Sequence, residues 1–267
     1  MAEIIIVRGG GDMASGVVQK FHRAGFHVLI LEIPEPTAIR RSVSLSEAVY
    51  DGEAKVEDID CRNIMAVDQL DDCWKERKVP LLIDPLGDAI RKVRPAAVID
   101  AILAKRNVGT NKEMAKIIIA LGPGFCAGED VHAVIETMRG HDLGRLILQG
   151  NAKPDTRIPE EIGGKSADRV LHAPVAGTVT AIKQIGDIVQ KGEVIFSVGG
   201  QAVYAAFSGL VRGMLRDSMK VTKGMKIADI DPRTDTDVCT ISDKSRCIGG
   251  SALEAYFFLR NKFGVDQ

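Results

Sequence analysis

Residues 3–32 read EIIIVRGGGDMASGVVQKFHRAGFHVLILE, and this stretch decides the fold expected for the first half of the chain. Residues 4–7 are a β-branched run that ends at three glycines. Apolar residues then recur at helical spacing through 17–21, and Gly25 stands where a helix would end. Residues 27–33 form a second apolar run. A strand, a glycine turn, a helix and a strand in this order open a parallel, doubly wound sheet.

The glycine turn also fits a nucleotide-binding pattern, G-x-G-x-x-A, placed between a strand and a helix. Glycines let the backbone approach a pyrophosphate, and a helix N-terminus supplies N–H groups and a partial positive charge. Glu32 ends the next strand, where an acid can bond a ribose hydroxyl. The predicted cofactor-binding residues of this turn are Gly9, Gly10, Gly11, Asp12, Met13 and Ala14. A turn that is glycine-rich for steric reasons alone stays open as the alternative.

Further apolar runs extend the expected sheet. Strands are predicted at 63–67, 79–85 and 115–122, and a helix at 94–107, where Pro95 suits the first turn. Residues 130–150 are interpreted as an antiparallel hairpin at the sheet edge. Strands that are apolar on both faces are typical of a helix-covered parallel sheet. The expected fold class is therefore α/β, with a Rossmann-like, mostly parallel sheet.

A second glycine loop follows the strand at 115–122. Gly122, Gly124 and Phe125 stand at the carboxyl end of that strand, where ligands of open α/β sheets gather, and they are predicted to bind the cofactor. An ordinary Gly-Pro-Gly turn is the alternative. Cys126 is a candidate for a catalytic thiol. The alternative is that it is a small apolar residue buried in the core. No other catalytic residue is predicted.

Two more groups of polar residues offer binding chemistry. Arg40, Arg41 and Ser42 could hold a phosphate, for instance one on a nucleotide ribose, and the alternative is a solvated loop. His132 and Glu136 share one face of a strand, which permits a metal or anion site without arguing for one. No metal site is predicted.

From residue 171 the chain repeats itself with a shift of 32 residues, so that Gly177 matches Gly209. The repeat predicts two interlocked β layers around one core. Residues 171–231 resemble biotinyl/lipoyl domains, which have the barrel-sandwich hybrid fold. In that family the modified lysine would fall at Val198, and residues 193–211 contain no lysine. The resemblance therefore implies the fold without the carrier chemistry, which leaves docking or scaffolding.

The last part of the chain predicts an amphipathic helix. Gly249, Gly250 and Ser251 are expected to cap its start, with Ser251 as N-cap, and its apolar face is expected to fold back onto one of the domains. The predicted domains are a nucleotide-binding domain at 1–158, a linker at 159–170, a β-rich module at 171–232 and a tail at 233–267.

Composition narrows the classes of protein. A formal charge of −1 and 4% aromatic residues give no case for binding nucleic acid or an anionic membrane. The five scattered cysteines favour a reducing compartment over a disulfide framework. No signal peptide or apolar span is recognised. We therefore expect a cytoplasmic protein.

Motifs along nearly the whole chain are similar to those of one family. VRGGGDMASG, RRSVSLSEAVYDG, ALGPGFCAGEDVHAVIET, RGHDLGR, HAPVAGTV and TISDKSRCIGG resemble accessory (maturation) proteins of selenium-dependent molybdenum hydroxylase systems. The first half is also similar to the Rossmann part of xanthine dehydrogenase accessory proteins. The resemblance implies an accessory factor that binds a dinucleotide or the molybdenum cofactor and assists its modification or insertion.

The resemblance implies that the partner is an apo molybdenum hydroxylase. Whether the protein also forms a homo-oligomer is left open. The expected cofactor is a dinucleotide, NAD(P) or molybdopterin dinucleotide. The alternative function is an NAD(P)-dependent oxidoreductase, for which the same glycines and Glu32 would serve. Neither a Tyr-x3-Lys pattern nor a clear His/Asp pair supports that alternative. Whether the protein is an enzyme stays undecided.

Overall fold

The computed structural model describes residues 2–156 and 161–264 and is a mixed α/β structure. Its contacts divide it into two compact units. Among the described residues, unit 1 comprises 2–36, 44–155 and 241–264, and unit 2 comprises 37–43, 156 and 161–240. This division differs from the expected boundaries at residues 37–43, which were expected in the first domain, and in the expected tail at 233–267, which the two units share. Part of the predicted linker, 159–160, lies outside the described residues.

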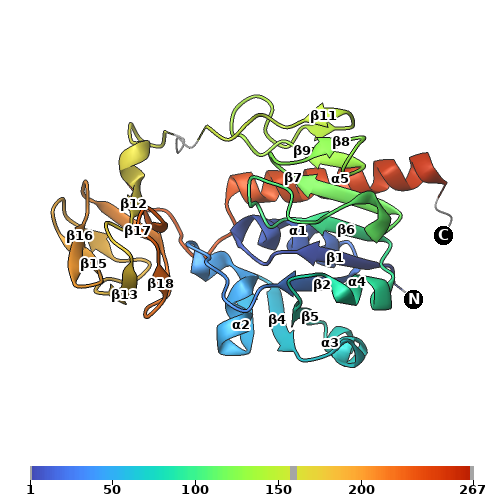
Figure 1. Cartoon of the computed structure of the whole chain (residues 1–267), viewed down its shortest axis with the longest axis horizontal. Coiled ribbons are helices and arrows are strands. Elements are labelled where there is room, and N and C mark those ends of the chain that lie inside the picture. The colour runs from blue at the N-terminus through green and yellow to red at the C-terminus, as the bar shows by residue number, and fades with distance from the viewer. Residues whose placement is uncertain (1, 157–160, 265–267) are drawn as a thin grey trace. The chain divides into compact units, whose positions relative to one another are not determined.

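Unit 1 is built on a nine-stranded sheet in the order β10-β9-β7-β6-β1-β2-β5-β4-β3. The pairs within β9 to β4 are parallel, and the edge strands β10 and β3 are antiparallel to their neighbours. Figure 1 shows this sheet in the blue-to-green part of the chain. The strands are β1 (Ile4–Arg8), β2 (His27–Glu32), β3 (Glu53–Val56), β4 (Ile59–Ile64), β5 (Val79–Ile83), β6 (Ala97–Asp100), β7 (Ile117–Leu121), β9 (Ala133–Ile135) and β10 (Leu146–Ile147). The predicted edge hairpin at 130–150 corresponds to β9 and β10.

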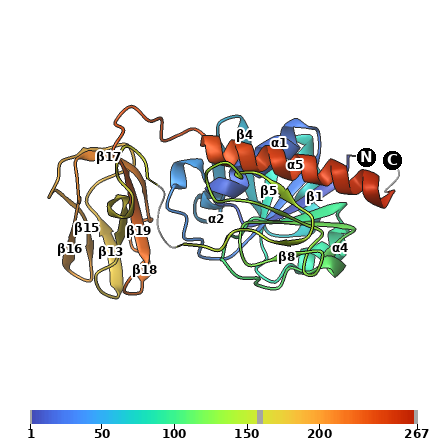
Figure 2. The same cartoon turned by 90° about the horizontal axis from the view of Figure 1, so that it is seen from above.

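Helices cover both faces of this sheet. α1 (Asp12–Arg23) and α5 (Asp243–Phe263) pack together, and Figure 2 shows them side by side. The other face carries a core cluster to which α3 (Leu70–Lys75) and α4 (Asp88–Val93) contribute. Unit 1 also holds α2 (Ala48–Asp51) and a small sheet of β8 (Cys126–Ala127) and β11 (Gly150–Asn151).

One predicted helix is a strand. Residues 94–107 were expected to be helical, but β6 occupies the centre of this range and pairs with β1 and β7. All four residues of β6 are buried. A short run that is apolar on both faces carries no periodicity to separate a buried strand from a helix. Its position between two parallel strands decides the structure.

The closing helix folds back onto the N-terminal unit, but it begins earlier than expected. Ser242, and not Ser251, is the N-cap of α5, and its hydroxyl accepts a hydrogen bond from the Ser245 N–H at 3.2 Å. Gly249 and Gly250 therefore lie inside the helix. The predicted cap is wrong because a glycine before an apolar run can also lie inside a helix, at a close crossing with another helix.

The crossing of α1 and α5 explains one of these glycines. A Cβ built on Gly249 would lie 2.3 Å from the carbonyl oxygen of Gly16 in α1, and one on Gly16 would lie 2.3 Å from that of Ser245. Next to this contact, Phe21 of α1 and Tyr256 of α5 meet edge to face, with centroids 5.8 Å apart. The two helix backbones touch because neither residue has a side chain.

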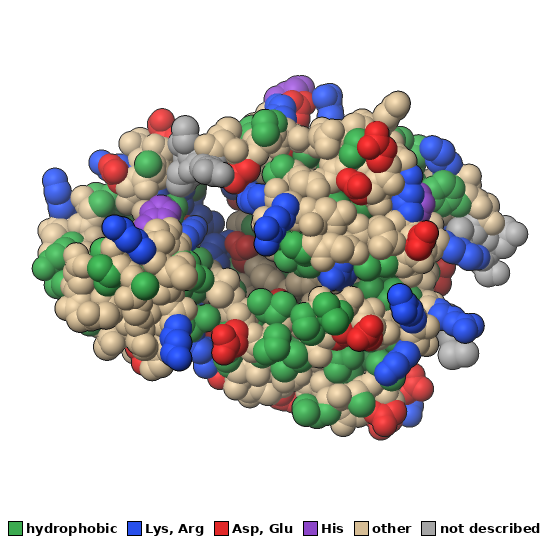
Figure 3. Space-filling model, in the orientation of Figure 1, with side chains coloured by type: hydrophobic (Ala, Val, Ile, Leu, Met, Phe, Trp, Pro, Cys, Tyr) green, Lys and Arg blue, Asp and Glu red, His purple; other side chains and the backbone are tan. Residues whose placement is uncertain are grey.

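Apolar side chains also reach the surface of unit 1. Figure 3 shows hydrophobic residues gathered over the region where Figure 1 labels β4 and β5. The exposed large apolar residues that follow or end the neighbouring strands β2, β5 and β4 are Ile33, Ile83, Leu86 and Met65. We call these four residues the apolar edge.

Unit 2 consists of two four-stranded antiparallel sheets, in the orders β12-β19-β17-β14 and β16-β15-β13-β18. Adding 32 residues to the starts of β13, β14 and β15 gives the starts of β17, β18 and β19. Each sheet mixes both halves of the repeat, since β14 pairs with β17 and β13 pairs with β18. The predicted interlocking is therefore observed. The strands are β12 (Val170–His172), β13 (Gly177–Ala181), β14 (Ile188–Val189), β15 (Val194–Val198), β16 (Gln201–Tyr204), β17 (Gly209–Met214), β18 (Lys220–Val221) and β19 (Lys226–Asp231).

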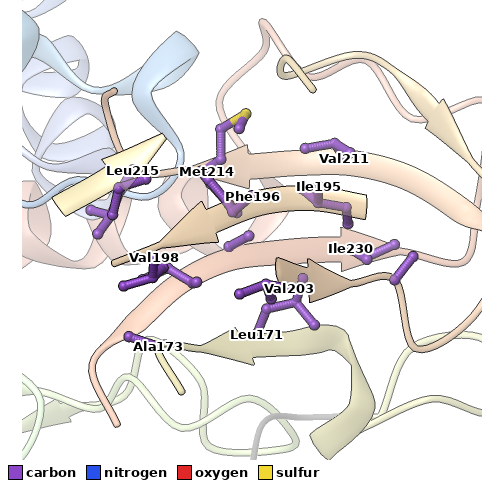
Figure 4. Close-up of a cluster of buried hydrophobic side chains, with 14 of the residues drawn as sticks. Leu171, Ala173, Ile195, Phe196, Val198, Val203, Val211, Met214, Leu215 and Ile230 are labelled. Carbon is purple, nitrogen blue, oxygen red and sulfur yellow. The ribbon is translucent and has the colours of Figure 1, made fainter. Parts of the chain in front are cut away.

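One apolar cluster fills unit 2. Figure 4 shows side chains from both sheets meeting in it, among them Phe196 and Val198 of β15 and Ile230 of β19. All three are fully buried. The core thus joins the two halves of the repeat, and neither half has a complete core without the other.

Candidate functional site

The carboxyl ends of β1 and β6 form a point where the chain order of the sheet reverses. β1 is followed by β2 on one side, while β6 and β7 lie on the other. Loops diverge from such a point and leave a crevice, which is where open α/β sheets bind ligands. The glycine turn at 9–11 leaves β1 here, and the loop at 101–111 leaves β6.

Two of the three glycines in the turn are required by the fold. Gly9 has φ +93°, and a Cβ on it would lie 3.0 Å from the carbonyl oxygen of Ala101. A Cβ on Gly10 would lie 2.9 Å from the backbone nitrogen of Ser46, whose N–H donates to the Gly10 carbonyl at 2.8 Å. The structure therefore explains both glycines without a ligand.

Gly11 is different. Its φ of −68° and ψ of −177° suit any residue, and a Cβ on it would meet no described atom within 4 Å. It is the N-cap of α1 and, being glycine, has no side chain with which to cap the helix. By contrast, the Asp84 carboxylate accepts from backbone N–H groups at the start of α4, and Ser242 caps α5. Serine or aspartate at position 11 would supply such a cap.

The remaining residues of the motif occupy the first turn of α1. Ala14 is fully buried, as the third small position of the motif requires for close helix packing. Asp12 and Met13 are partly buried. The N-terminus of this twelve-residue helix carries the partial positive charge of its dipole. The turn can therefore present N–H groups and that charge to an anion.

Glu32 lies beside the turn at the end of β2. Its carboxylate accepts hydrogen bonds from the Gly10 N–H at 2.7 Å and from the Ile33 N–H at 2.8 Å. Burial raises the pKa of Glu32, and these two hydrogen bonds partly oppose the shift. A carboxylate has about four lone-pair sites. Two of them remain for hydroxyl donors.

A buried polar network ties β1 to β6 at the same point. The Arg8 guanidinium donates to the Thr110 hydroxyl, which donates to Asp100 at 2.5 Å. All three residues are buried, and burial raises the pKa of Asp100. Sequence reasoning missed these residues, although a charged residue ending each apolar strand, as in IIIVR and AVID, was a signal for them.

The second glycine loop has structural reasons for its composition. A Cβ on Gly122 would lie 2.5 Å from the Thr137 hydroxyl, and one on Gly124 would lie 2.7 Å from backbone atoms of Arg106. Both glycines have positive φ, and Phe125 is buried in the core. These three predicted binding residues are thus used by the packing of the loop.

The environment of Cys126 disfavours a thiolate. Partial burial raises the pKa of its thiol, and the nearby Glu129 and Asp130 carboxylates raise it further. The Asp130 side chain accepts from the Cys126 backbone N–H at 2.8 Å. A nucleophilic cysteine needs the opposite surroundings, with positive charge beside the sulfur.

The predicted phosphate-binding arginines belong to unit 2 and contact its backbone. Arg41 donates to the Met214 carbonyl at 2.8 Å, and Arg40 donates to the Thr240 carbonyl at 3.3 Å. The Ser42 hydroxyl donates to the Val238 carbonyl at 2.5 Å. These side chains fasten residues 37–43 to unit 2, and the structure does not bring them together with the glycine turn within one unit.

His132 and Glu136 also take part in backbone contacts. His132 accepts from the Ile118 N–H at 3.0 Å, and burial lowers its pKa. Glu136 accepts from the N–H groups of Met138 and Lys153. Within residues 2–156 and 161–264, no group of three or more His, Cys, Asp or Glu side chains is arranged to hold a metal ion.

The position at which the resemblance to biotinyl/lipoyl domains places a modified lysine lies at the β15–β16 hairpin. Val198 ends β15 with its side chain in the core, and Gly199 and Gly200 form the turn. We predict that the purified protein carries neither biotin nor lipoate after co-expression with the two ligases. Intact mass spectrometry measures this, and a gain matching either group would contradict it.

Most of the chain is similar to a curated protein of Escherichia coli. No family model matches the chain. The uncharacterized protein YqeB of Escherichia coli K12 is 43% identical over 261 residues, which are 97% of this chain and 48% of that protein. The chain thus spans about half the length of the curated relative that it matches.

Solved structures are matched only weakly. An ectoine utilization protein, EutE, from Ruegeria pomeroyi is 10% identical, over 86% of this chain and 85% of its own, with a TM-score of 0.25. An aspartoacylase family protein from Mesorhizobium loti is 9% identical over 86% and 85%, with a TM-score of 0.27. A succinylglutamate desuccinylase from a Silicibacter species is 12% identical over 86% and 84%, with a TM-score of 0.26. Scores this low give no argument for a shared fold or activity.

These comparisons correct the identification made from sequence motifs. None of the proteins named above is a xanthine dehydrogenase accessory protein or a maturation protein of a molybdenum hydroxylase, and the curated relative is described only as uncharacterized. The assignment to molybdenum hydroxylase maturation is therefore withdrawn, with its selenium chemistry and its apo-hydroxylase partner. The alternative function, an NAD(P)-dependent oxidoreductase, is also withdrawn. No described helix is long and apolar enough to cross a membrane.

Proposed function

We propose that unit 1 binds the pyrophosphate of a dinucleotide at the N-terminus of α1, with Glu32 accepting hydrogen bonds from a ribose. Gly11 carries this proposal. Its backbone conformation suits any residue and its Cβ position is empty, so neither strain nor crowding requires a glycine there, and the open space is available to a ligand. A pyrophosphate oxygen placed against this backbone would need that space.

The neighbouring positions support the same reading. In a Rossmann-like nucleotide site the first glycine makes a tight turn, the second admits the pyrophosphate and the third small residue packs the helix on the strand. Gly9, Gly11 and Ala14 have a positive φ, an open Cβ position and complete burial, in that order. A turn built only for packing would not need an open second position.

The electrostatics of the turn favour an anion. Backbone N–H groups at the start of a helix have no partner within the helix. At α1 the N-cap is a glycine without a capping side chain, whereas Asp84 and Ser242 cap α4 and α5. A bound phosphate would serve as the cap of α1 and would interact favourably with its dipole.

For unit 2 the proposal is a barrel-sandwich hybrid fold that serves docking rather than transfer. Its two interlocked sheets and its repeat support that fold. The absence of a lysine at the Val198 position removes the chemistry by which such a module would carry a covalent group.

The proposal predicts a pH-dependent affinity. Isothermal titration of the full chain with NAD and ADP-ribose is expected to show binding that weakens as the pH falls through the raised pKa of Glu32. Below that pKa the carboxyl is protonated and accepts less well from a ribose hydroxyl. Glu32→Gln is expected to weaken binding by about 1–3 kcal/mol and to flatten the pH profile.

Glu35→Gln is the matched control, since this residue is exposed three positions further along the same loop. It should leave both affinity and pH profile unchanged. Wild-type protein that binds no dinucleotide at any pH would refute the proposed function.

A further inference from the structure

The apolar edge is exposed to an unusual degree for side chains of this size. Ile33 is 44% exposed, Met65 83%, Ile83 38% and Leu86 78%. These residues come from the carboxyl ends of β2, β4 and β5, which are neighbours in the sheet. Exposed apolar side chains at the ends of adjacent strands mark a place where something binds, because on most protein surfaces such side chains are scattered singly.

The apolar edge lies next to Glu32 of the candidate site. Ile83 is the register partner of Glu32, and the Asp84 N–H donates to the Glu32 carbonyl at 2.9 Å. Ile33 directly follows Glu32 in the chain. Since adjacent strands lie about 4.8 Å apart, the three strand ends span about 10 Å, which is the size of a nucleobase with its sugar.

The carboxylate of Asp84, which follows β5 directly, is occupied by backbone groups. The Asp84 carboxylate accepts hydrogen bonds from the N–H groups of Gly87, Asp88 and Ala89, at 3.0, 3.1 and 2.8 Å. Its lone pairs serve the start of α4. The carboxylate of Asp84 is thus engaged by the backbone of α4, and a flat, weakly polar ring bound at the edge would not have to desolvate it.

We propose that the apolar edge binds the base of the nucleotide whose ribose contacts Glu32. The inference rests on the proposed function. The base is joined to the ribose by one bond, so a ribose at Glu32 places its base within reach of Ile33 and Leu86. The edge contributes apolar contact and little hydrogen-bond selection, so the site takes a nucleotide with limited preference among bases.

The test compares a ligand with a base and a ligand without one. Full-chain protein is titrated with ADP-ribose and with inorganic pyrophosphate, and the double variant Met65→Ser/Leu86→Ser is compared with wild type. The double variant is expected to bind ADP-ribose about tenfold more weakly, from the lost apolar contact, and pyrophosphate equally well. Ile188→Ser, at an exposed apolar residue of unit 2, is the control and should change neither affinity.

The outcomes separate the two proposals. If the wild type binds both ligands and the double variant loses nothing for ADP-ribose, the base does not contact the apolar edge and the inference fails, while the pyrophosphate site stands. If the wild type binds neither ligand, the proposed function fails and the inference fails with it. All three substituted side chains are exposed, so the variants are expected to stay folded. A thermal melt of each variant checks this.

Discussion

Gly249→Ala is expected to lower the free energy of unfolding of unit 1 by about 2 kcal/mol, although alanine is the better helix former. The new Cβ would lie 2.3 Å from the Gly16 carbonyl oxygen, and the obstacle is backbone rather than a side chain that can rotate. α1 and α5 would have to move apart, which opens the packing around Tyr256. Overpacking at such contacts typically costs 1–3 kcal/mol.

Gly250→Ala is the matched control, because this glycine is in the same helix and a Cβ on it would meet nothing within 4 Å. It should raise stability by about 0.8–1 kcal/mol, the helix propensity difference between the two residues. Urea unfolding of both variants, followed by circular dichroism, gives the comparison. Equal effects of the two substitutions would show that the helix crossing is looser than described.

The parts of the fold that followed from the sequence are those in which local pattern and tertiary context agree. Between β1 and β2 the sequence has a β-branched run that ends at three glycines and then apolar residues at helical spacing that end at Gly25. The repeat in unit 2 was visible because both halves occupy equivalent environments, so the same glycines and apolar residues recur at 177 and 209.

The errors fall where tertiary context decides. β6 is buried on both faces and so has no periodicity of its own. Gly249 and Gly250 resembled a helix start, and only the position of Gly16 shows why one of them lies within a helix. Local pattern contains no information about which backbone will lie against a glycine.

The candidate site shows the same limit. Gly11, Gly122 and Gly124 all follow parallel strands and are equivalent by sequence. The structure separates them, because Gly122 and Gly124 have positive φ and crowded Cβ positions, whereas Gly11 has neither. Arg41 likewise offered a phosphate ligand by composition, and its guanidinium contacts a carbonyl of unit 2.

Gly11→Val is therefore expected to remove dinucleotide binding while leaving the fold nearly unchanged. With φ at −68° and an open Cβ position, valine is accommodated, and a poorer N-cap costs less than about 1 kcal/mol. The branched side chain would fill the space that a pyrophosphate needs, so the affinity for ADP-ribose should fall by about 100-fold or more. Calorimetric titration and a thermal melt on the same variant measure both effects.

Gly9→Ala is the contrasting variant. At φ +93° and 3.0 Å from the Ala101 carbonyl oxygen, its new Cβ is strained and crowded, so this substitution should destabilise unit 1 by more than about 1 kcal/mol. If the turn is a binding site, Gly11→Val lowers the affinity and leaves the stability nearly unchanged, whereas Gly9→Ala lowers the stability. If Gly11→Val instead melts early and Gly9→Ala does not, the open space at Gly11 is not a feature of the folded protein. Unchanged binding by Gly11→Val would mean that any ligand lies elsewhere.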